Sequence, residues 1–158
     1  MPTKDAVIAA LREAIARDLT AVAEGTAHAR AEATSAESKA ENKYDTRATE
    51  ASYLAAGQGR RLEGLRHVAG WLDQLDPSAV REDVGMGALV ELAEAGRPPR
   101  WVLVGPTGGS TVRVEGVPVM LLSLDSPLGE ALDEAEPDEV VEVDSPRGVR
   151  RLRIVTIG

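Results

Sequence analysis

The feature that most constrains the fold is the absence of proline between Asp5 and Leu75. Within this stretch apolar residues recur three or four positions apart, a spacing that forms one face of an α-helix. Two such runs are separated by an Asn-Lys-Tyr-Asp break, and Asp76-Pro77 ends the second, because proline cannot continue a helix. The first run is Val7, Ile8, Leu11, Ile15, Leu19 and Val22, and the second is Tyr53, Leu54, Leu62, Leu65, Val68, Leu72 and Leu75.

Neither apolar stripe can be buried alone, so we expect the two helices to pack as an antiparallel hairpin. If Leu11 faces Leu72 and Leu19 faces Leu65, the bend falls near residue 42, within AENKYDTRATEAS (40–52). Asp45 suits the N-cap of the second helix. Each arm would have about 30 to 35 residues, and at about 1.5 Å per residue the hairpin would be about 45 to 50 Å long.

After Pro77 the apolar period changes from three or four to two, which is typical of β-strands. One helix interrupts the strands, since Ser126 can cap it, Pro127 fits its first turn, and Leu128, Ala131 and Leu132 give it an apolar face. The sequence therefore predicts an α+β protein, with an antiparallel helical hairpin over residues 1–76 and a small antiparallel β domain over residues 77–158. The predicted strands are 84–94, 99–105, 110–116, 118–124, 139–143 and 149–157.

Charge and composition exclude several classes of function. The formal net charge of −8 disfavours binding to DNA in a sequence-specific way and binding to an anionic membrane. DNA and such a membrane surface are both polyanions and would repel the chain. No apolar run approaches the roughly 20 residues that span a bilayer, and the first residues form no clean signal segment, so we expect a cytoplasmic protein. The absence of cysteine excludes disulfides, thiol catalysis and cysteine-ligated zinc, and two histidines disfavour a histidine metal site.

The segment VLVGPTGGST (102–111) is similar to a phosphate-binding loop, but it lacks the lysine that would contact the phosphates. A strand pattern follows it instead of a helix, so no helix N-terminus is available for an anion. We therefore interpret this segment as a hairpin turn.

The acidic residues around the predicted bend, Glu41, Asp45 and Glu50, have two interpretations. In the first they are capping or solvated residues, each worth at most about 1 kcal/mol. In the second they are oxygen ligands for Mg²⁺, which keeps several waters and takes only one or two protein carboxylates. Such a pair would bind weakly by itself and would need ligands from a partner. Lys43 and Arg47 lie beside these acids and favour docking into a charged site.

Residues 123–157 resemble the C-terminal domain of the Gre-factor (GreA/GreB-like) family of bacterial transcription elongation factors. The matching positions include a Ser-Pro-Leu-Gly motif, an acidic step into a strand, and a final Pro-Gly hairpin. They are Ser126, Pro127, Leu128, Gly129, Ala131, Leu132, Asp138, Val140, Val141, Pro146, Gly148, Ile154 and Val155, with Pro137 in place of the family's usual glycine. Residues 50–61 are also similar to the family, with Tyr53, Ala55 and Ala56 in place.

The resemblance implies an FKBP-like sheet and an accessory factor that is not itself an enzyme. Its partner would be RNA polymerase, bound through Ser126, Pro127, Leu128 and Gly129. The hairpin tip would enter the secondary channel, contact the polymerase through Lys43, Tyr44 and Arg47, and meet nascent RNA only indirectly. Asp45, Glu41 and Glu50 would assist cleavage of backtracked RNA, with Asp45 and Glu41 sharing a Mg²⁺ with the polymerase; no cofactor of its own is implied.

The tip departs from the family pattern. Aligned on Tyr53, the family's two catalytic acids would fall at Thr46 and Thr49. Either the register differs and Asp45 with Glu41 does the same work, or the tip occupies the channel as a non-cleaving inhibitor or modulator. Two other classes of protein are alternatives, a peptidyl-prolyl isomerase and a structural coiled-coil protein. The isomerase is disfavoured because Trp101 is the only aromatic residue of the sheet half.

Overall fold

The computed structural model describes the backbone of residues 1–39 and 47–158, and the side chains of residues 1–25, 28, 31 and 56–158. The chain forms two compact units. Met1–Arg12 and Trp71–Gly158 make up the first, called here the sheet unit, and Glu13–Gly70 make up the second, the helical unit. The boundary predicted between residues 76 and 77 stays a prediction.

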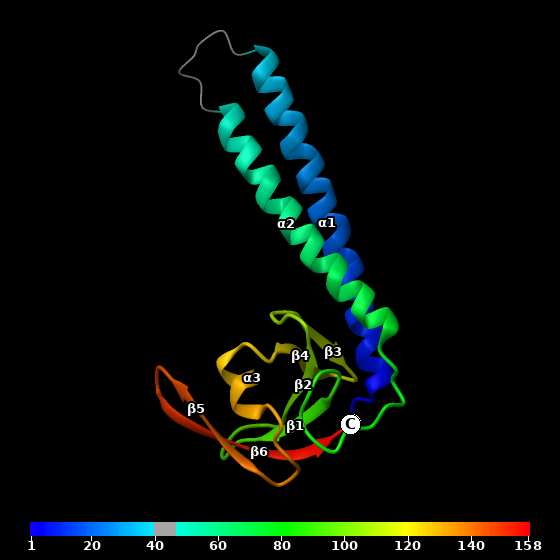
Figure 1. Ribbon diagram of the computed structural model, residues 1–158, viewed down its shortest axis with the longest axis vertical. Coiled ribbons are helices and arrows are strands. Elements are labelled where there is room, and N and C mark those ends of the chain that lie inside the picture. Colours follow the sequence, from blue (N-terminus) through cyan, green and yellow to red (C-terminus); the bar gives the residue numbers. More distant parts are fainter. Residues whose placement is uncertain (40–46) are drawn as a thin grey trace. The chain divides into compact units, whose positions relative to one another are not determined.

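The proline-free stretch forms two long helices, α1 (Lys4–Lys39) and α2 (Arg47–Gln74), as predicted. The two helices run antiparallel (Figure 1). Thr3 caps α1, since its Oγ1 accepts a hydrogen bond from the Ala6 N–H at 3.2 Å. In the sheet unit, Arg12 Nη2 donates to the Leu72 carbonyl oxygen at 2.9 Å, as expected if Leu11 faces Leu72. Within the helical unit, the apolar stripe residues Ile15, Val22 and Val68 are buried.

Six strands form one sheet in the order β3-β4-β2-β1-β6-β5. Their bounds are β1 Leu89–Ala93, β2 Arg100–Gly105, β3 Thr111–Val114, β4 Val117–Ser123, β5 Val140–Ser145 and β6 Gly148–Ile157. The one short helix of this half, α3, covers Pro127–Leu132, where the sequence predicted it. The prediction of an α+β fold with these elements is confirmed.

Two details of the sheet differ from prediction. β2 and β4 pair in parallel, with Trp101 beside Val119 and Gly105 beside Ser123, so the sheet is mixed and not wholly antiparallel. The hairpin predicted over residues 102–111 is also wrong, because β3 pairs with β4 and not with β2. After β2 the chain forms β3 at the edge of the sheet and leaves room for one strand between them. It then reverses through a tight turn at Glu115 and Gly116, both with positive φ, and β4 takes the place between β3 and β2.

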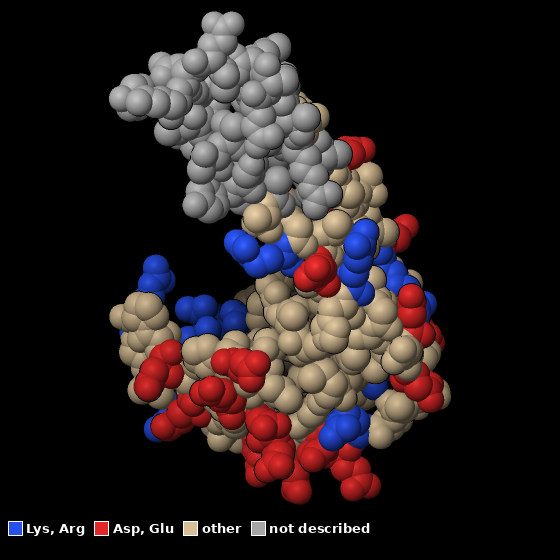
Figure 2. Space-filling model, turned by 45° about the horizontal axis from the view of Figure 1, so that its top comes forward, with Lys and Arg blue, Asp and Glu red and all other residues tan. Residues whose placement is uncertain are grey.

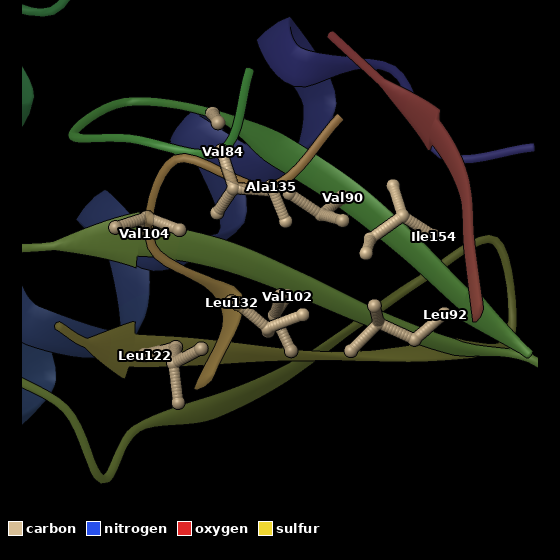
Figure 3. Close-up of a cluster of buried hydrophobic side chains, with 10 residues drawn as sticks. Val84, Val90, Leu92, Val102, Val104, Leu122, Leu132, Ala135 and Ile154 are labelled. Carbon is tan, nitrogen blue, oxygen red and sulfur yellow. The ribbon is translucent and has the colours of Figure 1, made fainter. Parts of the chain in front are cut away.

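The main core lies on the face of the sheet that α3 covers (Figure 3). Alternate residues of β1, β2, β4 and β6 point into it, because side chains along a strand alternate between the two faces. Leu132 of α3 is fully buried in this core. Val84 is held beside it by backbone hydrogen bonds with Glu134 and Ala135, which follow α3. The members of this cluster are Val84, Ala88, Val90, Leu92, Val102, Val104, Leu122, Leu132, Ala135 and Ile154.

Neither the long helices nor α3, over the residues described, contains an apolar stretch of the length that a membrane span requires.

Candidate functional site

The first candidate site is the start of α3, which carries the predicted polymerase contacts. Ser126 is the N-cap, and its Oγ accepts a hydrogen bond from the Gly129 N–H at 3.1 Å. The same hydroxyl donates to the Ser123 carbonyl oxygen at 2.7 Å, which ties the cap to the end of β4. Pro127 occupies the first turn, where its missing N–H costs nothing. The motif therefore builds a rigid helix start directly after β4.

Gly129 is glycine because no side chain fits at its position. A Cβ built there would lie 2.0 Å from the Ser123 carbonyl oxygen and 2.6 Å from the Leu124 Cα. Real Cβ atoms essentially never approach other atoms closer than 3.0 Å. The buried Gly129 thus lets the first turn of α3 lie against the chain that leaves β4.

The four residues of the motif differ in their access to a partner. Gly129 is buried, Ser126 and Leu128 are half-buried, and Pro127 is exposed. Leu128 packs against the main core. Contact with RNA polymerase stays a prediction for all four, and Pro127 has the side chain most open to such a contact.

The second candidate site is the predicted tip, and its residues fall outside what the structure describes. Glu41, Lys43, Tyr44 and Asp45 lie in the gap between α1 and α2, and the side chains of Arg47 and Glu50 are likewise not described. The residues that are described hold no group of three or more His, Asp or Glu side chains that could bind a metal. A shared Mg²⁺ site at Asp45 and Glu41 therefore stays a prediction.

Sequence reasoning missed a third site, a cavity at one end of the sheet whose lining includes Glu94, the partner of Arg150. Arg150 Nε donates to Glu94 Oε1 at 2.9 Å, and its Nη2 donates to Glu94 Oε2. These hydrogen bonds hold the pKa of Glu94 below its ordinary value and raise that of Arg150. The neighbouring cavity measures about 220 Å³ and is lined by Leu92 and Leu152, among others. No aromatic residue lines it, which gives no support for an isomerase site there.

Exposed carboxylates gather between α3 and β5. Figure 2 shows Asp and Glu side chains crowded on one part of the sheet unit. This part of the surface repels polyanions. The exposed acidic residues of this segment are Asp133, Glu134, Glu136, Asp138 and Glu139.

Comparisons with known proteins bear on these sites. The family model described as transcription elongation factor GreA/GreB, C-terminal, matches residues 79–158, about half of the chain. No curated protein sequence matches the chain.

Among solved structures, the Gfh1 protein of Thermus thermophilus, a GreA factor homolog, is 22% identical over 93% of this chain and 94% of that one, with a TM-score of 0.39. Thermus aquaticus Gfh1 is 24% identical over 92% of each chain, with a TM-score of 0.39. The GreA/GreB factor of Nitrosomonas europaea is 22% identical over 60% of this chain and 78% of that chain, with a TM-score of 0.36.

Two antiparallel helices, a mixed six-stranded sheet and a capped Ser-Pro-Leu-Gly helix make this an α+β protein. The family model that matches its C-terminal half describes transcription elongation factors. The chain belongs to the GreA/GreB family of transcription elongation factors. The resemblance found in the sequence is confirmed.

Proposed function

We propose that this elongation factor binds RNA polymerase through the α3 side of its sheet unit and inserts the α1–α2 tip into the secondary channel of the enzyme. The observation that carries the proposal is the family match over residues 79–158, which includes the whole of α3 and its cap. It acts as an accessory factor, since the chemistry takes place at the metal centre of the polymerase.

At that centre the tip acids assist cleavage of backtracked RNA. Phosphodiester hydrolysis with two metal ions requires negative oxygen ligands that position the second ion and its water. Asp45, Glu41 and Glu50 are the acids of the tip sequence, and Asp45 with Glu41 would share the Mg²⁺ with the polymerase. Lys43, Tyr44 and Arg47 would contact the channel beside them.

A second candidate function is a modulator that occupies the channel without supporting cleavage. The specific observation in its favour is that Thr46 and Thr49 stand where alignment on Tyr53 places the two acids of cleaving members. A threonine hydroxyl is neutral, so it does not supply the negative charge that a carboxylate brings to a divalent cation.

The two candidates are separated by adding the protein to a stalled, backtracked elongation complex of the polymerase from the same organism. Cleavage would be established if the wild-type protein shortens the transcripts and Asp45→Asn does not. The matched control, Asp133→Asn, lies far along the sequence and should shorten them as the wild type does. Changed elongation without shortening would establish the modulator. If neither transcript length nor elongation changes, both functions are refuted.

Docking is tested separately by the affinity of the protein for core polymerase. Pro127→Ala removes the most exposed side chain of the α3 start while leaving the Ser126 cap intact, and we expect roughly tenfold weaker binding, the size of one lost apolar contact at an interface centre. Pro137→Ala, at another exposed proline of the sheet unit, serves as control. Equal affinity of the two variants would contradict docking through α3.

A further inference from the structure

The cavity near Glu94 lies at the end of the sheet opposite the α3 start. It is formed where β2 and β4 begin, whereas α3 follows the end of β4. Figure 3 shows Leu92, which lines the cavity, at one end of the core cluster and Leu122, near the end of β4, at the other. A ligand in this cavity would therefore not compete with a partner bound at Pro127.

The wall of the cavity is apolar and rigid. Leu92 and Leu152 form its buried part, and Pro98, Pro99 and Pro118 form its exposed part. Because a proline ring has little conformational freedom, such a wall loses little entropy when a ligand binds. At about 220 Å³ the cavity is smaller than the roughly 300 Å³ or more of a typical small-molecule site, and it suits one side chain of a larger partner.

The rim of the cavity is positively charged, although the chain carries a net charge of −8. Arg97 and Arg100 line the cavity together with one carboxylate, that of Glu94, which is already paired with Arg150 outside the lining. Arg150 forms two hydrogen bonds with that carboxylate, and Arg97 Nε lies 3.8 Å from its Oε2, too far for a hydrogen bond. The guanidinium group of Arg97 therefore keeps most of its capacity to bind an anion, and the half-buried Arg100 lines the same cavity.

We propose that this cavity binds an acidic peptide segment of a partner protein, which places one aliphatic side chain against the prolines and pairs a carboxylate with Arg97 and Arg100. A nucleic acid is a poorer match, because it repeats a phosphate at every nucleotide and the proline wall offers those phosphates no donor. A short acidic peptide has both the apolar group and the localised charge that the lining residues complement.

The test is a titration of the full-length, ¹⁵N-labelled protein at low ionic strength with a blocked hexapeptide that alternates leucine and glutamate. We expect amide shifts at Leu92, Arg97 and Leu152, and binding that weakens as salt is added. The control peptide has glutamine in place of each glutamate and therefore lacks the carboxylate that pairs with the arginines. It should bind at least about tenfold more weakly, a difference of about 1.4 kcal/mol. Equal binding of the two peptides, or no shift at these residues, would overturn the proposal.

Two arginine variants sharpen the result. Arg100→Ala should weaken the acidic peptide about tenfold, whereas Arg147→Ala, which removes an exposed arginine at the β5–β6 turn, should leave its affinity within about twofold. Arg100→Lys keeps the charge and should lose less, which guards against misfolding of the alanine variant. Equal losses at Arg100 and Arg147 would show non-specific attraction and refute the site. Shifts of the same amides by inorganic phosphate or a short RNA, without any by the peptide, would refute it in favour of a phosphate ligand.

Discussion

Adding one methyl group at Gly129 tests the structural account of the α3 start. In an open helix position, Gly→Ala stabilises by about 1 kcal/mol, because alanine loses less backbone entropy than glycine. Here the new Cβ would lie 2.0 Å from the Ser123 carbonyl oxygen, and the atoms in its way belong to the backbone. Overpacking of this kind costs about 1 to 3 kcal/mol, and displacing the chain from the Ser126 cap adds about 1 kcal/mol. We expect a net loss of about 2 kcal/mol in the free energy of unfolding.

For a unit of roughly 100 residues that loss lowers the melting temperature by about 10 °C. Calorimetry of the full chain measures it, with Gly64→Ala as the control, since nothing lies within 4 Å of a Cβ built at Gly64 in α2. The control should melt at or slightly above the wild-type temperature. If Gly129→Ala melted as high as wild type, the close approach of α3 to the end of β4 would be refuted.

Three further predictions concern packing and charge. Leu132→Ala, at a fully buried position, should lower the free energy of unfolding by about 2 to 5 kcal/mol in urea titrations, and a loss under about 1 kcal/mol would contradict its place in the core. Arg150 keeps the folded-state pKa of Glu94 below its ordinary value of 4.5, so this pair stabilises the fold above that value and the contribution is lost as the pH falls through the lowered pKa. Wild type should therefore lose more stability than Glu94→Gln between pH 6 and pH 3, and parallel urea midpoints would disprove the coupling. Asp73→Ala should change stability by no more than about 0.5 kcal/mol, because its ion pair with Arg12 is exposed, and a larger change would show that the pair is shielded from solvent.

The sequence predicts those parts of the fold that depend on local signals. The apolar spacing of α1 and α2, the strand alternation and the Ser126-Pro127 helix start all lie within a few residues. The structure has an element at each of these places, although the first strand, predicted over 84–94, covers only Leu89–Ala93. The parallel pairing of β2 with β4 is not predictable in this way, because alternation along a strand is the same whichever neighbour it takes.

The candidate sites follow the same division. The α3 motif is contiguous and was recognised, although its polymerase contact stays a prediction, as do the roles of the tip acids. The pair of Glu94 with Arg150 joins residues 56 positions apart, and the cavity beside it collects residues from four strands. One signal in the sequence points to this pair. Arg150 lies two and four residues before Leu152 and Ile154, so the three side chains share the core-facing side of β6.

The position of β6 has a consequence for how the sheet unit is made during translation. β6 lies between β1 and β5, and it pairs with β1 across more than fifty residues of intervening chain. Contacts so distant in sequence form slowly, and here they must wait until β6 has left the ribosome. Until then β1 has one unpaired edge, so a nascent chain halted before residue 148 would expose a strand edge open to aggregation or chaperone capture.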